Sequence, residues 1–143
     1  MATRRHAQGS ARALSETARR TSEARSSPVI SHIVFFRPKP SLSPADRDAL
    51  IAAFRTAVQE IPTVRGVRAG RRVTHGAGYE QTAPNLEILI AIDFDDLAGL
   101  QTYLRHPAHA ELGARFNQAM DSGVVYDFEV GSDLEVQLRD RHV

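Results

Sequence analysis

Apolar residues alternate with polar ones in some stretches of this chain and recur at helical spacing in others. Alternation places every second side chain on one face of a strand, whereas apolar residues three and four apart share one face of a helix. The clearest alternation is in Leu86–Phe94. Further strands are predicted over 29–36, 67–73 and 124–130. The first of them is apolar on both faces, which is typical of a strand covered on two sides.

Helices are predicted in two places between these strands. One covers 43–61, where Ser43 can cap the helix and Pro44 suits its first turn. The other covers 96–120 and begins with an aspartate as cap. We expect this second helix to break at His106-Pro107, because a proline disfavours the helical conformation in the residue before it and fits the start of a new helix.

These elements follow the order β-α-β-β-α-β, which predicts an α+β fold with a four-stranded antiparallel sheet and helices on one side. The opposite face of that sheet is partly apolar, since Ile33, Phe35, Leu89 and Ala91 point towards it. A monomer would expose this patch to water. Two sheets that pair face to face would cover it, so we expect a homodimer with twofold symmetry.

The distribution of charge predicts three parts of the chain. Six arginines and two glutamates lie in 1–28, whereas the remainder carries twelve basic and fifteen acidic residues. Because 1–28 has little to bury, we expect a disordered basic tail. A transit peptide, a basic arm for an acidic partner, or a translation start placed too early remain alternatives. The folded domain is expected over 29–131 and a C-terminal extension over 132–143, where alternating apolar residues could prolong the last strand.

Composition excludes several classes of function. Without cysteine the chain has no disulfide, thiolate metal site or cysteine nucleophile. A net charge of +1 argues against a nucleic-acid-binding protein. The chain has no apolar run of membrane-spanning length and no secretory signal, so we expect a cytoplasmic protein with no membrane partner. The glycines Gly76 and Gly78 do not follow a strand that leads into a helix, and we expect no cofactor.

Three residues are candidates for chemistry. His109 is expected near the start of a helix, where the dipole and burial both favour the neutral imidazole that a general base requires. Tyr103 precedes the proline break and could stabilise an oxygen that gains negative charge. His32 lies in the first strand and could approach from below. A group of this kind would suit proton removal next to a carbonyl, or an intramolecular aldol step.

Each of these residues also has a purely structural interpretation. His106 could be a helix cap, and His109 a buried imidazole bonded to a carbonyl of the sheet. His32 could belong to the core and Tyr103 could be an ordinary half-buried tyrosine. A metal site on His106, His109 and Glu111 is conceivable, but the break would turn the rings apart, and we expect no metal.

Two segments resemble the stress-responsive A/B barrel (Dabb) family. Ile30–Phe36 is similar to the family's first strand, with its histidine, and Tyr103–His109 is similar to its Y-x-x-H-P-x-H segment. The resemblance covers 29–130 and implies a ferredoxin-like subunit that forms a dimeric α/β barrel. A polyketide cyclase of this family uses the tyrosine and the last histidine of the segment as its catalytic pair, which implies those roles for Tyr103 and His109.

Three functions are compatible with this sequence. The first is a homodimer that binds a small hydrophobic or aromatic molecule between sheet and helices. The second is an acid/base enzyme similar to a polyketide cyclase, with His109 as base and Tyr103 as acid. The third, by analogy of fold alone, is a cofactor-independent monooxygenase. Whether the protein is an enzyme at all stays open at this point.

Overall fold

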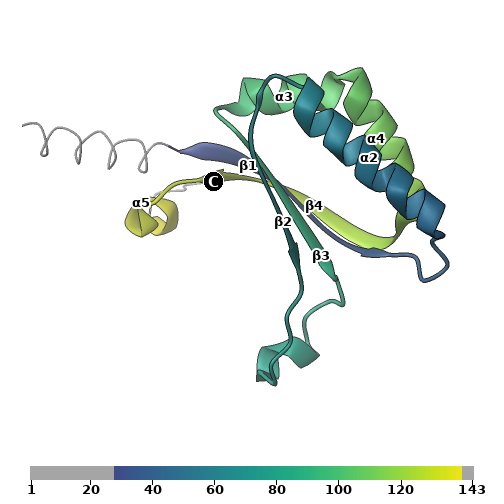
Figure 1. Ribbon diagram of the computed structural model, residues 1–143. Coiled ribbons are helices and arrows are strands. Elements are labelled where there is room, and N and C mark those ends of the chain that lie inside the picture. The colour runs from purple at the N-terminus through teal and green to yellow at the C-terminus, as the bar shows by residue number, and fades with distance from the viewer. Residues whose placement is uncertain (1–27, 140–143) are drawn as a thin grey trace, which may run out of the picture. The chain divides into compact units, whose positions relative to one another are not determined.

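A computed structural model describes residues 28–139 of the chain (Figure 1), so most of the predicted tail, and 140–143, lie outside the described residues. The elements alternate between strands and helices in the predicted order. They are β1 (Val29–Pro38), α2 (Pro44–Glu60), β2 (Val64–Arg71), a short 3₁₀ helix (Gly78–Gln81), β3 (Ile88–Phe94), α3 (Leu97–Arg105), α4 (Pro107–Ala119), β4 (Met120–Val130) and α5 (Leu134–Arg139). In the described residues, no helix is both long and apolar enough to cross a membrane.

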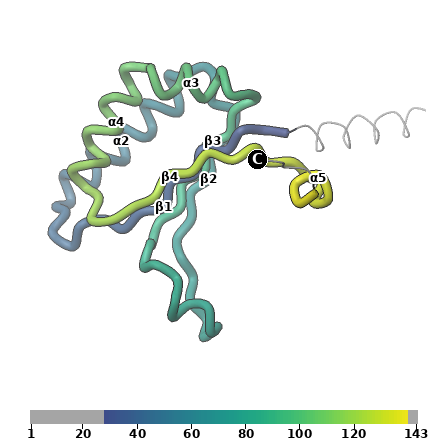
Figure 2. Tube along the Cα trace, turned by 180° about the vertical axis from the view of Figure 1, so that it is seen from behind, coloured from purple at the N-terminus to yellow at the C-terminus, as the bar shows by residue number. Residues whose placement is uncertain are grey.

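The four strands form one antiparallel sheet in the order β2-β3-β1-β4. In the central pair, His32 of β1 lies opposite Ile92 of β3, and Ile33 lies opposite Ala91. Helices α2, α3 and α4 cover one face of this sheet (Figures 1 and 2). The fold is therefore α+β and ferredoxin-like, as the order of the elements predicts.

The core lies between the sheet and these three helices. Alternate residues of β1 and β3 point into it, because consecutive side chains of a strand face opposite sides. From the helices, Ala57 of α2, Leu100 and Tyr103 of α3 and Leu112 of α4 are buried against them. The strand residues of this core are Val34, Phe36, Ile90, Ile92 and Phe94.

The opposite face of the sheet is apolar and open. Phe35, Leu89, Val124 and Tyr126 line a groove there, and Phe128 follows on the same face of β4 with its ring 5.9 Å from that of Tyr126. Tyr126 and Phe128 are each 51% exposed. This confirms the apolar patch at Phe35 and Leu89 and extends it to β4, whereas Ala91, which was predicted to belong to it, is buried.

One prediction about local structure was wrong. Beyond Gly131 the chain does not continue as a strand: it forms the short helix α5, and the side chain of Asp133 accepts a hydrogen bond from the backbone of Val136, as an N-cap does. The long loop after β2 contains an ordered turn. The Glu80 carboxylate accepts backbone hydrogen bonds from His75 and Ala77, and a 3₁₀ turn forms there.

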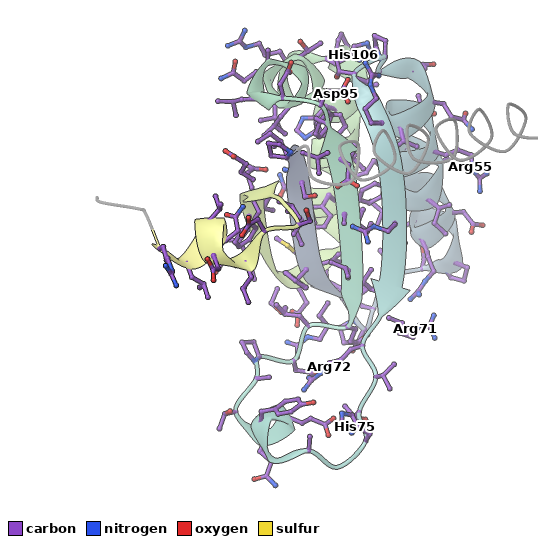
Figure 3. The ribbon with its side chains drawn as sticks, turned by 90° about the vertical axis from the view of Figure 1, so that its left-hand side faces the viewer. Arg55, Arg71, Arg72, His75, Asp95 and His106 are labelled. Carbon is purple, nitrogen blue, oxygen red and sulfur yellow. The ribbon has the colours of Figure 1, made fainter. Side chains whose placement is uncertain are left out.

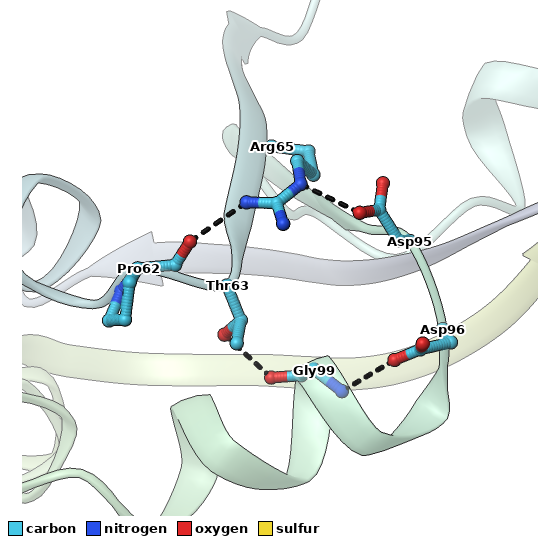
Figure 4. Close-up of polar contacts among 6 residues, drawn as sticks. All are labelled: Pro62, Thr63, Arg65, Asp95, Asp96 and Gly99. Atoms are coloured by element: carbon cyan, nitrogen blue, oxygen red, sulfur yellow. Dashed lines mark hydrogen bonds and ion pairs between the residues drawn. The ribbon is translucent and has the colours of Figure 1, made fainter.

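Polar contacts fix the start of α3 against the start of β2 (Figure 4). Asp96 caps α3 by accepting from the Gly99 backbone at 2.8 Å, and the Thr63 hydroxyl donates to the Gly99 carbonyl at 2.8 Å. Arg65 pairs with Asp95 at 2.7 Å in a solvent-exposed contact. The first two contacts hold the helix that carries Tyr103 in place.

We expect Asp96→Ala to lower the free energy of unfolding by about 1 kcal/mol, since it removes a helix cap. The matched control is Asp95→Ala, which removes the neighbouring carboxylate and only an exposed ion pair that water screens. Urea unfolding followed by circular dichroism measures both. Equal losses in the two variants would contradict the capping role of Asp96.

Candidate functional site

Tyr103 lies on the buried face of α3. Its side chain is 1% exposed, and its ring packs against Phe94 of β3 with centroids 5.2 Å apart. Burial raises the pKa of Tyr103 to about 12, because the phenolate would lose its hydration. The residue therefore stays a neutral phenol at physiological pH and can donate a hydrogen bond.

His106 forms the joint between α3 and α4. It is both the C-cap of α3 and the N-cap of α4. Its Nδ1 atom accepts a hydrogen bond from the backbone N–H of Ala108 at 3.0 Å. Pro107 is the first residue of α4, where its missing N–H is not needed. This confirms the predicted break and the structural interpretation of His106.

His109 lies in the first turn of α4 and faces Tyr103. The two rings are 4.8 Å apart at their centroids in an edge-to-face arrangement. The pKa of His109 is lowered, chiefly by burial and then by the neighbouring His32, while the Leu104 carbonyl acts in the opposite sense. Both lowering effects favour the neutral imidazole near pH 7, which is the form that can accept a proton.

His32 approaches the same place from β1. It is 7% exposed, and its ring lies 5.8 Å from that of Tyr103. Its Nδ1 atom is 2.6 Å from a carboxylate oxygen of Asp127 on β4. With the proton on Nδ1, His32 donates to this carboxylate and its Nε2 atom is left as an acceptor.

Asp127 was missed by the reasoning from sequence. The alternation of Val124, Tyr126 and Phe128 gave the apolar face of the last strand, and Asp127 falls on the other face. A carboxylate at an inward position of a strand is a signal in itself. Its partner could not be named, however, because only the pairing of β4 with β1 brings it to His32.

A cavity of about 360 Å³ lies between the sheet and the helices at this point. The three candidates His32, Tyr103 and His109 all line it, whereas His106 does not. The remaining lining is mostly apolar and includes Val34, Phe54, Ile92, Leu112, Gly113, Phe116 and Val125. The volume suits a small organic molecule, and such pockets combine apolar walls with a few polar groups.

The arrangement can move a proton. The neutral imidazole of His109 lies beside the neutral phenol of Tyr103 in a mostly apolar cavity. The imidazole can accept a proton while the phenol donates a hydrogen bond. Over residues 28–139, no group of three or more histidine, aspartate or glutamate side chains is placed to hold a metal ion.

Comparison with known proteins gives one relative by sequence and several solved structures of similar fold. Olivetolic acid cyclase of Cannabis sativa is 21% identical over 102 residues, which make up 69% of this chain and 94% of that protein. The solved structure of the hydroxynitrile lyase from Passiflora edulis superimposes with a TM-score of 0.65 at 22% identity, covering 76% of this chain and 98% of the lyase.

A bacterial structure is also similar. It is a dimeric ferredoxin-like protein of unknown function from Thermobifida fusca, with a TM-score of 0.57 at 23% identity. The superposition covers 72% of this chain and 92% of the bacterial protein. At these identities the solved structures establish the fold alone. The family is established by a sequence model described as the Stress responsive A/B Barrel Domain, which matches residues 30–130. This chain therefore belongs to the stress-responsive A/B barrel domain (Dabb) family.

Proposed function

We propose that this protein binds a small hydrophobic or aromatic molecule in the cavity between the sheet and the helices. The observation that supports this most directly is the lining of the cavity: three polar ring groups, His32, Tyr103 and His109, converge on an otherwise mostly apolar space. A molecule with an aromatic or aliphatic body and one or two oxygens would match these walls. Hydrogen bonds to the imidazoles and to the Tyr103 hydroxyl would orient it.

A second candidate function is acid/base catalysis on a carbonyl compound. The pairing of His109 with Tyr103 favours it, because burial lowers the pKa of the imidazole and raises that of the phenol. In the first step His109 removes a proton from the carbon beside the carbonyl, and the C–H electron pair moves into an enolate. The Tyr103 phenol donates a hydrogen bond to the enolate oxygen. Attack of the enolate carbon on a second carbonyl of the same molecule would then close a ring, and the oxygen of that carbonyl would take the proton held by His109, which restores the base.

The hydrogen bond between His32 and Asp127 supports a positioning role in either function. The Asp127 carboxylate is 2.6 Å from Nδ1, so it holds one tautomer and one orientation of the imidazole. The Nε2 atom is then free to accept a hydrogen bond from a ligand hydroxyl. The names of two similar proteins, a cyclase and a lyase, support an enzymatic role without defining a substrate for this chain.

We further propose that two subunits pair through the open face of the sheet. Phe35, Tyr126 and Phe128 lie on this face, and the last two are half exposed. Pairing through it would remove a contiguous apolar surface from water. The similar protein from Thermobifida fusca is described as dimeric, which supports the same assembly here.

Gly113→Leu is expected to abolish ligand binding and to preserve the fold. Gly113 lines the cavity, and a Cβ atom built there meets nothing within 4 Å, so a larger side chain has space to fill. The probe is acetophenone, detected by ligand-observed NMR. Gly78→Leu is the matched control, since its Cβ atom also meets nothing but the residue lies in the loop. Equal binding by both variants would show that the ketone binds elsewhere.

The catalytic candidate predicts exchange of the methyl protons of acetophenone in D₂O, followed by NMR. Tyr103→Phe and His109→Gln should each slow this exchange about a hundredfold, a typical contribution of an acid or base. Because the pKa of His109 is lowered, the wild-type rate should persist to a lower pH than an ordinary histidine would allow. His75→Gln, in the exposed loop, is the control. Unchanged exchange in His109→Gln would remove this residue from the mechanism.

The dimer predicts a solution mass of two chains at micromolar concentration by light scattering. Phe128→Glu places a charge on the open face and should shift the mass towards one chain. Val73→Glu introduces the same charge at a residue that is 77% exposed in the loop and should leave the mass unchanged. Circular dichroism confirms that both variants are folded. A folded wild-type monomer would exclude this interface.

A further inference from the structure

A second cavity, of about 520 Å³, lies where β1 and β2 end. Its lining differs from that of the first cavity, with which it shares no residue. Five of its side chains are basic and one, Glu87, is acidic. The basic residues, which we call the basic cluster, are Arg37, Lys39, Arg47, Arg71 and Arg72.

Three separate elements supply the basic cluster. Arg37 and Lys39 flank the end of β1, Arg47 lies in the first turns of α2, and Arg71 and Arg72 mark the end of β2. Figure 3 shows Arg71 and Arg72 where β2 runs into the loop. The cluster is therefore a product of the tertiary fold and not of one charged segment.

The register of the sheet directs Arg71 towards the side of α2. Arg71 lies opposite Ile88 of β3, which itself lies opposite Phe36 of β1. Phe36 points into the core beneath the helices, so all three side chains share that face. Arg47, at the start of α2, lines the second cavity together with Arg71.

Most of this charge has no acidic partner. Arg37 pairs with Asp121 at 2.6 Å, and Arg72 donates to the Glu80 carbonyl at 3.2 Å, which fixes its side chain without neutralising it. Within the described part of the chain, no carboxylate forms a salt bridge with Lys39, Arg47 or Arg71.

The positive charges of the basic cluster repel one another, and a bound anion would relieve this repulsion. Repulsion among cations in one concave site raises the local potential and attracts counter-ions. Guanidinium groups bind phosphate and carboxylate through paired hydrogen bonds, and this geometry favours anions with several oxygens. Cations supplied by three separate elements match a ligand with more than one anionic group.

We propose that the basic cluster is a binding site for a small polyanion, a molecule with two or more closely spaced phosphate or carboxylate groups. Extended nucleic acid matches the site less well, because the cations line a cavity and the chain as a whole carries a net charge of only +1. The site is distinct from the cavity that holds His109, so this proposal goes beyond the function proposed above.

Isothermal titration calorimetry with inorganic pyrophosphate tests the site directly. We expect wild-type protein to bind it, and Arg47→Gln and Arg71→Gln each to weaken binding about tenfold, as the loss of one charged contact would. Arg55→Gln is the matched control: it removes the same charge from the same helix, and Figure 3 shows Arg55 away from the end of β2. This variant should stay within about twofold of wild type.

Citrate and a short duplex DNA, titrated in the same way, identify the chemistry that the site prefers. Tighter binding of pyrophosphate indicates a phosphorylated ligand, and tighter binding of citrate indicates a polycarboxylate. Either outcome supports the proposal when Arg47→Gln and Arg71→Gln weaken it. The proposal is overturned by three results: no heat with either small anion, equal weakening in Arg55→Gln, or tighter binding of DNA than of both small anions. Circular dichroism establishes that each variant is folded.

Discussion

The joint at His106-Pro107 is the constraint on which the candidate site depends. In an uninterrupted helix, two residues six positions apart point about 120° away from each other, so Tyr103 and His109 could not meet. Pro107 cannot continue α3 without losing a hydrogen bond, and a new helix starts there with the His106 imidazole as its cap. The change of direction brings the two rings to 4.8 Å. The polar contacts at the start of α3 then fix the whole pair above the sheet.

The sheet separates two kinds of apolar surface. On the helix side, Val34, Ile92 and Phe94 are closely packed, and the packing leaves a cavity that His32 and His109 help to line. On the open side, Phe35, Tyr126 and Phe128 are held by the strands, and α2, α3 and α4 all lie on the other face. The apolar side chains on the helix face are therefore covered within the chain itself, whereas those on the open face would need a second surface to cover them.

The two cavities differ in the chemistry that they can recognise. The first has mostly apolar walls and three ring groups that can donate or accept hydrogen bonds, so shape and a few directed contacts would select its ligand. The second is lined by cations, and charge would select its ligand. Residues 32 and 37 of β1 contribute to one cavity each, which places both sites along a single strand. The first cavity would favour the apolar part of a ligand, and the second cavity would favour an anionic part.

The sequence by itself determined the order of the four strands and the main helices, the cap at Ser43, an aspartate cap before the second helix, and the break at His106-Pro107. These follow from neighbours in the chain, since strand alternation, helix capping and the missing N–H of proline are local properties. The sequence also identified His32, Tyr103 and His109 as candidates for acid/base chemistry. Only the tertiary structure decided that Asp127 reaches His32 and that five distant cations share one cavity. Those contacts join strands and helices far apart in sequence, and they depend on which strands become neighbours in the sheet, which the pattern within one strand does not specify.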